Sequence, residues 1–202
     1  MVHATGMKLR RILSGLVLIG VFTCGGPVVA GPFEDGLAAY EGGNNAAALR
    51  LFLPLAEQGH AGAQVQMGRM YASGHGLPQD HIAAVAWFRL AAEQGNANAQ
   101  RNLGIMFKRG RGVPTDYGAA ADWFRLAAEQ SDPAAQADLG DMYKDGRGVT
   151  QDYVLAHMWY SLAAGQDHEG AARQLRSVGL LMTPAQIGEA QRLAREWKPK
   201  MP

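Results

Sequence analysis

The chain has 202 residues, of which 48% are hydrophobic and 18% charged, and its formal net charge is +1. This composition excludes a disordered protein, and the length allows one domain of ordinary size with a buried core. The small net charge provides no strong field to attract nucleic acid or an anionic membrane. No run of about 20 apolar residues occurs, so we expect no membrane span in the mature protein.

The first thirty residues have the pattern of a secretory signal peptide. A basic start precedes an apolar run at positions 12–22, and small residues follow it, with Val28 and Ala30 placed as a cleavage site requires. We therefore expect residues 1–30 to be a signal peptide and the mature protein, from residue 31, to be periplasmic or secreted. The basic residues of this segment are Lys8, Arg10 and Arg11.

Cys24 is the only cysteine of the sequence and lies in this segment. Cleavage after Ala30 would leave a slightly acidic mature chain with no disulfide, no thiolate nucleophile and no cysteine-based metal site. Two alternatives stay open. One is an uncleaved N-terminal anchor, and the other is lipid modification of Cys24, although Thr23 replaces the small residue that usually precedes a lipidated cysteine. The true start is either Met1 or Met7.

From residue 61 the sequence repeats itself every 36 residues. The blocks 61–96, 97–132 and 133–168 align without a gap, and the octapeptide WFRLAAEQ occurs at both 87–94 and 123–130. A fixed period of about 20–50 residues is typical of a solenoid, in which each unit buries its apolar face against its neighbours. The shared positions include Ala63/Ala99/Ala135, Gln64/Gln100/Gln136, Met70/Met106/Met142 and Trp87/Trp123/Trp159.

Each block is predicted to form two helices joined by a short loop that contains glycine. The first helix begins after Asn96 or Asp132, which are good N-cap residues, and Pro133 occupies the favoured first helical position. It ends at a glycine that can take the left-handed conformation, which is Gly110 in the middle block. Asp116 then caps the second helix. The residues of the first block that form one apolar stripe on this second helix are Ala84, Trp87, Phe88 and Ala91.

Another glycine recurs inside the first helix, at Gly68, Gly104 and Gly140. Glycine costs about 1 kcal/mol relative to alanine in a helix interior, so its recurrence indicates a steric requirement. We expect a bulky side chain of the second helix, Trp87 or Phe88 and their equivalents, to lie against bare backbone at these glycines.

The two ends of the array depart from the repeat. A shortened repeat at residues 33–60 precedes the full blocks, and residues 169–198 form a C-terminal cap. Thr183 and Gln186 make the pattern of a capping box. The sequence therefore predicts an all-α fold over residues 31–202, a right-handed, tetratricopeptide-like α-solenoid of helical hairpins with about four repeats and a capping helix. The apolar side of that helix consists of Ile187, Ala190, Leu193, Ala194 and Trp197.

The repeated motif resembles that of the Sel1-like repeat (SLR) family, a relative of the tetratricopeptide repeat. The match is strongest in ANAQRNLGIMFKRGRGVPTD and PAAQADLGDMYKDGRGVTQD, and TPAQIGEAQRLAREW is similar to the closing segment of bacterial members. The resemblance covers residues 33 to 197 and is more specific for fold than for activity. It implies an adaptor or scaffold, which in bacterial members is periplasmic or secreted and serves signalling, envelope functions or host contact.

The sequence offers no motif for catalysis, cofactor binding or metal binding. The loop GRGVPT lacks the third glycine of a dinucleotide fingerprint and the lysine of a phosphate-binding loop. No serine begins an S-x-x-K motif, and the chain lacks the cysteines of those family members that are linked to β-lactam binding or hydrolysis. We expect no enzyme, no cofactor and no metal. The histidines beyond residue 30 lack metal-ligand spacing, and we expect them to face solvent or to cap helices: His60, His75, His81, His157 and His168.

The positions on the first helices that vary between repeats are the predicted partner-binding residues. In solenoids of helical hairpins the first helices line the concave surface. The middle repeat brings Arg101, Ile105 and Lys108, a basic and apolar patch, and the last full repeat brings Asp138 and Asp141. This distribution predicts a charge gradient along the groove. The complete set is Gln66, Arg69, Arg101, Asn102, Ile105, Lys108, Asp138 and Asp141.

We therefore expect a non-enzymatic scaffold that binds a protein or an extended peptide, for example an envelope or membrane-sensor protein, and does not bind nucleic acid. Two other hypotheses stay open. The first is an envelope enzyme that acts on peptidoglycan or β-lactams, and the second is a structural lipoprotein held through Cys24. The sequence does not indicate the oligomeric state.

Overall fold

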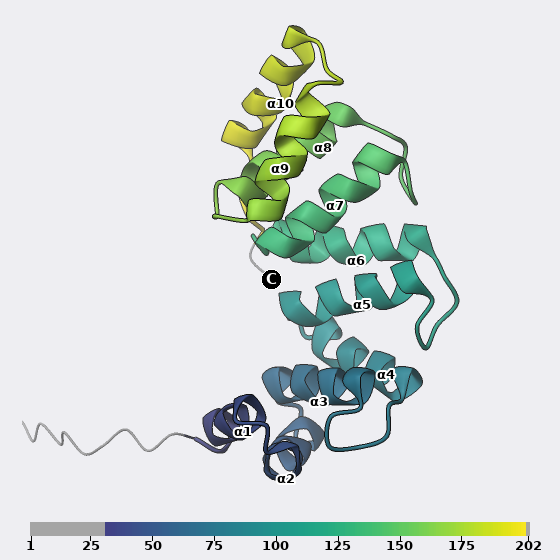
Figure 1. The fold of residues 1–202 in the computed structure, drawn as a ribbon, viewed down its shortest axis with the longest axis vertical. Coiled ribbons are helices and arrows are strands. Elements are labelled where there is room, and N and C mark those ends of the chain that lie inside the picture. Colours follow the sequence, from purple (N-terminus) through teal and green to yellow (C-terminus); the bar gives the residue numbers. More distant parts are fainter. Residues whose placement is uncertain (1–30, 201–202) are drawn as a thin grey trace, which may run out of the picture.

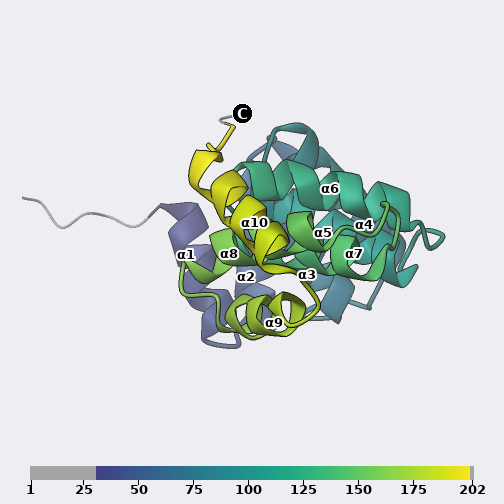
Figure 2. The ribbon, with the colours of Figure 1, turned by 90° about the horizontal axis from the view of Figure 1, so that it is seen from above.

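The computed structural model describes residues 31–200, and within this range it contains ten α-helices and no strand. The helices stack as hairpins along the long axis of the molecule, from α1 and α2 at one end to α9 and α10 at the other (Figure 1). Viewed along this axis, successive hairpins are turned relative to one another (Figure 2). The bounds are α1 Pro32–Glu41, α2 Asn45–Glu57, α3 Ala61–Ser73, α4 His81–Glu93, α5 Ala97–Arg109, α6 Tyr117–Glu129, α7 Pro133–Asp145, α8 Tyr153–Ala164, α9 Glu169–Gly179 and α10 Pro184–Glu196.

This architecture confirms the predicted all-α solenoid of stacked hairpins. The expected signal peptide, residues 1–30, lies outside the described residues. Between residues 31 and 200, no helix combines the length and the hydrophobicity that crossing a membrane would require.

The ends of the helices lie where the sequence predicts them. Asn96 accepts a hydrogen bond from the amide of Ala99, and so caps α5. Gly110 ends the same helix in the left-handed conformation, with φ +62°, and its amide donates to the carbonyl of Met106. Asp116 caps α6 by accepting from the amide of Ala119. These caps satisfy backbone groups that have no partner within the helix.

The glycines inside the first helices provide space for an aromatic ring. A Cβ atom on Gly104 would lie 2.6 Å from the ring of Phe124, and Gly68 faces Phe88 at the same distance. In the last full repeat the ring facing the glycine belongs to Tyr160. Phe88 and its equivalents, and not the tryptophans, therefore close each hairpin. The tryptophans pack against the preceding hairpin instead, as Trp123 does on the cluster that contains Val85 and Phe88.

Buried glutamines join each hairpin to the next. The Gln100 side chain donates from Nε2 to the carbonyl of Ala92 at 3.3 Å, and its Oε1 accepts from Gln130 Nε2 at 2.7 Å. The carbonyl of Ala92 lies in the last turn of α4, where carbonyls lack helical partners. The glutamine at the last position of WFRLAAEQ is therefore one of the two glutamines that each repeat contributes to a hydrogen-bonded ladder. The other bonds of this ladder are Gln64 to Ala56, Gln94 to Gln64, Gln136 to Ala128 and Gln166 to Gln136.

The loop glycines make a second joint between hairpins. Gly112 has φ +71°, and a Cβ atom there would collide with the backbone carbonyl of His81 in the preceding repeat. Gly148 lies in the same way against the carbonyl of Tyr117. Each loop therefore touches the first turn of the second helix one repeat earlier, and a side chain at this glycine would separate the two.

The C-terminal cap departs from the hairpin geometry. Helix α9 follows α8 as a first helix would, but α10 packs on α8 and makes few contacts with α9. Thr183 and Gln186 form the predicted capping box at the start of α10. The apolar side of α10 contributes Leu193 and Trp197 to the core that also contains Trp159. The cap therefore covers the exposed face of the last full hairpin.

We predict that Gly104→Leu lowers the melting temperature by several degrees. The new side chain would need the space that Phe124 occupies, and overpacking of this kind costs about 1–3 kcal/mol. Gly188→Leu in α10 is the matched control, because nothing lies within 4 Å of a Cβ atom at Gly188. Thermal unfolding followed by circular dichroism should leave the control at or above the wild-type value. Equal melting curves for the two variants would contradict the packing role of Gly104.

Gly112→Ala and Gly43→Ala should separate backbone strain from loss of the contact between repeats. Both glycines have positive φ, +71° and +77°, so alanine is strained at each by about 1–2 kcal/mol. Only Gly112 lies against another backbone, while nothing lies within 4 Å of a Cβ at Gly43. We expect Gly112→Ala to be clearly less stable than Gly43→Ala in chemical denaturation. A Gly43→Ala loss as large as that of Gly112→Ala would show that conformation alone requires these glycines.

Candidate functional site

Two depressions open on the side of the stack that the first helices form. One, with a volume of about 360 Å³, lies between α3 and α5 and reaches Tyr40 of α1. The other, of about 220 Å³, lies between α5, α7 and α9. Six of the eight predicted partner-binding residues line them, and Gln66 and Lys108 do not. The first depression contains Arg69, Asn102 and Ile105, and the second contains Arg101, Asp138 and Asp141.

The predicted charge gradient is replaced by ion pairs across the boundary between two repeats. Arg101 Nε lies 2.9 Å from Asp138 Oδ2, and Lys108 Nζ lies 3.7 Å from Asp138 Oδ1. Lys108 also lies over the ring of Phe124, 5.8 Å from its centroid. The basic residues of α5 and the acidic residue of α7 therefore neutralise each other, and they do not form separate basic and acidic patches.

The acidic residues of the second depression are engaged in structural contacts. Tyr160 donates a hydrogen bond from its hydroxyl to Asp141 Oδ1 at 2.6 Å, and burial together with this carboxylate raises the pKa of Tyr160. Burial also raises the pKa of Asp138, and this effect exceeds the opposing influence of Arg101 and Lys108. Asp138 and Asp141 therefore hold α7 to its neighbours, and their carboxylates are already engaged within the chain.

The first depression has a different character, and we call it the first-helix groove, lined by Tyr40, Arg69, Asn102, Ile105, Arg109 and Arg111 among others. Within residues 31–200, its three arginines take part in no ion pair. The guanidinium groups of Arg69, Arg109 and Arg111 are exposed beside apolar surface. Such groups favour carboxylate partners, which they bind in bidentate fashion.

Tyr40, Arg109 and Arg111 of this groove are absent from the sequence prediction. Tyr40 belongs to the shortened repeat, and its hydroxyl lies 3.0 Å from His75 Nδ1. Arg109 and Arg111 flank the glycine that ends α5, so they read as C-cap and loop residues in the sequence. The variation between repeats at positions 109 and 111 is the sequence signal that could have identified these two arginines.

The prediction that the histidines face solvent or cap helices holds for His60, His75 and His168, but not for His157, and His81 is half-buried with its Nδ1 covered. His60 and His168 cap α3 and α9 by accepting hydrogen bonds from the amides of Ala63 and Ala171. His157 is buried, with 7% of its surface exposed, and burial lowers its pKa. The expectation that it faces solvent or caps a helix is wrong, because it lies in the middle of α8 on the side packed into the stack. No group of three metal-ligating side chains is found in the part of the chain that the structure describes.

Comparison with known proteins identifies the repeat. The Sel1 repeat family model matches residues 33–60, 61–96, 97–132 and 133–168. The crystal structure of a protective antigen of uropathogenic Escherichia coli strains, which displays an SLR fold, is 38% identical to the chain, with a TM-score of 0.70. A Sel1 repeat protein from Oxalobacter formigenes is 35% identical, with a TM-score of 0.67. No match was found among curated proteins.

The chain is shorter than these two structures. The similarity to the Escherichia coli protein covers 81% of this chain and 37% of that one, and the similarity to the Oxalobacter formigenes protein covers 71% and 58%. The four matched repeats fit the predicted solenoid.

We predict that Asp138 makes stability fall as the pH rises. Its raised pKa means that the folded protein keeps the proton to higher pH than the unfolded chain does. The stabilising effect is therefore complete below the ordinary pKa of 3.8 and is lost as the pH rises through the folded value. The difference in melting temperature between wild type and Asp138→Asn, measured from acidic to neutral pH, should change in this direction. A pH-independent difference, or one of opposite sign, would show that the ion pairs dominate over burial.

Proposed function

The chain belongs to the Sel1 repeat family, and we propose that it is a non-enzymatic scaffold that binds a protein or an extended peptide in the first-helix groove. Sel1 repeat proteins generally mediate protein–protein interactions and are typically non-enzymatic repeat scaffolds. The observation that supports the groove is that its arginines, Arg69, Arg109 and Arg111, form no ion pair within residues 31–200 and lie beside Tyr40 and Ile105.

The chemistry of the groove favours a segment that carries carboxylates and an apolar side chain. Three guanidinium groups can each bind a carboxylate, and Ile105 and Met106 provide apolar contact between them. The helices that carry these residues are fixed by the glycine, glutamine and loop contacts of the stack. A preformed surface of this kind loses little ordering entropy on association.

We propose a periplasmic or secreted location for the mature protein. The support is the sequence pattern of residues 1–30, in which a basic start, an apolar centre and small residues follow in the order of a secretory signal peptide. Mass determination of the N-terminus of the protein from its native cell separates cleavage after Ala30 from lipid attachment at Cys24.

Charge reversal in the groove should abolish partner binding. Partners crosslinked in intact cells would be compared between wild type and Arg69→Glu/Arg109→Glu, which breaks no ion pair of the part of the chain that the structure describes. We expect at least a tenfold lower recovery of the specific partner. Arg50→Glu/Arg176→Glu is the matched control, since both arginines are exposed and line neither depression. Equal recovery by the groove variant and the control would remove the groove from the proposal.

A further inference from the structure

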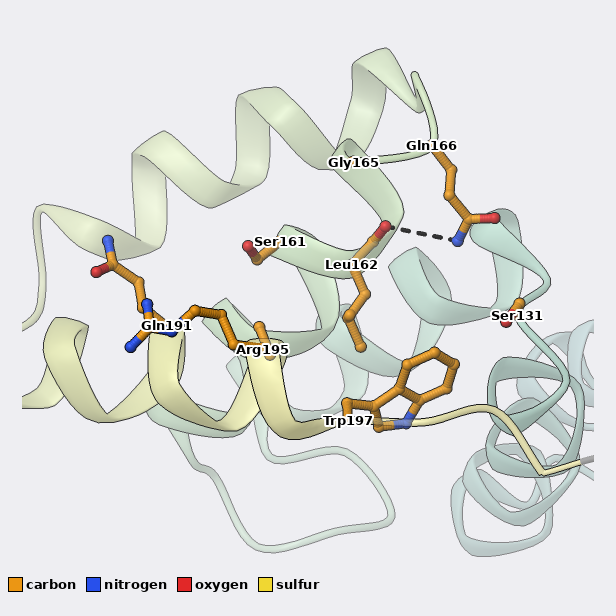
Figure 3. Close-up of a pocket in the computed structure, with 9 residues that line it drawn as sticks. Ser131, Ser161, Leu162, Gly165, Gln166, Gln191, Arg195 and Trp197 are labelled. Carbon is orange, nitrogen blue, oxygen red and sulfur yellow. Dashed lines mark hydrogen bonds between the residues drawn. The ribbon is translucent and has the colours of Figure 1, made fainter.

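A third depression lies on the side of the second helices, where the C-terminal segment covers the last full hairpin. It has a volume of about 470 Å³ and is enclosed by α8, α10 and the turn that follows α6 (Figure 3). This volume falls within the range of about 300–1,000 Å³ in which proteins hold small molecules. We call it the cap depression, and its lining includes Ser131, Ser161, Leu162, Gln191, Arg195 and Trp197.

The lining departs from the repeat at three positions. At positions 161 and 165 the earlier repeats carry long charged side chains, and here they are replaced by serine and glycine. At position 131 a glycine is replaced by serine, which adds a hydroxyl group to the wall. These changes leave space beside α10 and remove a carboxylate from it. The replaced residues are Arg89 and Arg125 for Ser161, Glu93 and Glu129 for Gly165, and Gly59 and Gly95 for Ser131.

An aromatic ring forms the apolar wall of the cap depression. The ring of Trp197 meets that of Trp159 edge to face, with 6.1 Å between centroids, and it lies beside Leu162 of α8 (Figure 3). Trp159 is buried, whereas Trp197 keeps part of its surface exposed. An indole ring that is fixed by one aromatic neighbour and open on another side packs favourably against a further aromatic ring.

The charge of the cap depression is positive. Arg195 is the one ionisable side chain in its lining, and it forms no ion pair within residues 31–200. The carboxylate of Glu129, at the end of α6, accepts a hydrogen bond from the ammonium of Lys200 at 2.8 Å and is thereby neutralised. A guanidinium group in such surroundings attracts an anion, and it binds a carboxylate in bidentate fashion.

Other polar groups of the lining are also available to a ligand. Within residues 31–200, the hydrogen bonds of α8, α10 and the turn after α6 involve none of the side chains of Ser131, Ser161 and Gln191. In Figure 3 the polar ends of Gln191 and Arg195 lie at one end of the cap depression and the ring of Trp197 at the other. A ligand that fits this arrangement has a polar, anionic end and an aromatic end.

The C-terminal segment limits the length of the ligand. After Trp197 the chain runs to the end of α6, where the amide of Lys200 donates to the carbonyl of Glu129 at 2.7 Å. The segment therefore closes the cap depression beside the tryptophan, so that a short molecule fits there better than an extended chain.

We propose that the cap depression binds a small molecule in which an aromatic ring carries a carboxylate. The ring packs on Trp197 and Leu162, the carboxylate pairs with Arg195, and the amide of Gln191 and the hydroxyl of Ser161 donate to its oxygens. This site lies outside the first-helix groove and adds a small-molecule ligand to the proposed scaffold role.

The test titrates the full chain with phenylacetate and follows the indole N–H signal of Trp197 by NMR. The signal is assigned by its loss in Trp197→Phe. We expect a saturable shift with phenylacetate, and at least fivefold weaker binding of phenylacetamide, which lacks the charge, and of acetate, which lacks the ring. Glucuronate, a carboxylate on a hydroxylated ring, should also bind at least fivefold more weakly.

Two variants with matched controls locate the binding. Arg195→Gln should weaken phenylacetate at least fivefold and leave phenylacetamide unchanged, whereas Arg176→Gln, at an exposed arginine of α9, should change neither. Ser161→Leu should fill the space and weaken both compounds, and Ser177→Leu, at an exposed serine of α9, is its control. The melting temperature shows whether Ser161→Leu disturbs the packing of α10. Arg195 is exposed, so Arg195→Gln tests the site without this complication.

The absence of a saturable shift with phenylacetate would overturn the proposal and show that the small residues only make room for α10. Equal binding of phenylacetamide, or an equal effect of Arg176→Gln and Arg195→Gln, would remove the carboxylate from it. Binding of glucuronate as tight as that of phenylacetate would assign the site to a sugar instead. Arg69→Glu/Arg109→Glu should titrate like the wild type, so failure at the cap depression leaves the first-helix groove proposal standing.

Discussion

The packing of an aromatic ring against the backbone of a helical glycine is the contact on which the rest of the structure depends. At Gly104 the two helices of a hairpin approach until the Phe124 ring occupies the place of a side chain. Burying the ring stabilises the fold by about 2–3 kcal/mol, which exceeds the roughly 1 kcal/mol that a helical glycine costs. Because the same contact recurs at Gly68 and Gly140, all full hairpins have one geometry, and their outward side chains recur in one orientation.

Backbone carbonyl groups then fix each hairpin to the next. Gln100 bonds the carbonyl of Ala92, and Gly112 lies against that of His81, so one joint is a hydrogen bond and the other a close contact. Neither position accepts another residue easily. The hydrogen bond needs the buried side-chain amide of Gln100, and the close contact at Gly112 leaves no room for a side chain. The ladder ends where Ala172 replaces the glutamine, and α10 covers the last hairpin there.

The sequence predicts those parts of the structure that depend on local rules. Caps, C-terminal glycines and the period of 36 residues follow from neighbours in the chain, and they were predicted correctly. The Arg101–Asp138 ion pair was not, because it joins residues 37 apart whose approach depends on the rotation between hairpins. The same rotation leaves Arg109 and Arg111 without an ion pair within residues 31–200. The burial of His157, by contrast, follows the repeat, since the equivalent Val85 and Ala121 are also buried. Which charged residues are available to a partner is therefore a property of the stack and not of the repeat.

Stacking explains the tryptophan, the phenylalanine, the alanines and the glutamine of WFRLAAEQ, but it does not explain the leucine. The tryptophan packs on the preceding hairpin, the phenylalanine on glycine, the alanines in the core and the glutamine in the ladder. Leu90 and Leu126 stay nearly half exposed, and only Leu162 is covered, by the chain's own C-terminal segment. The leucine is therefore covered only where the array ends, because there the chain supplies a segment that lies over it, whereas between successive full repeats the stacking leaves it exposed.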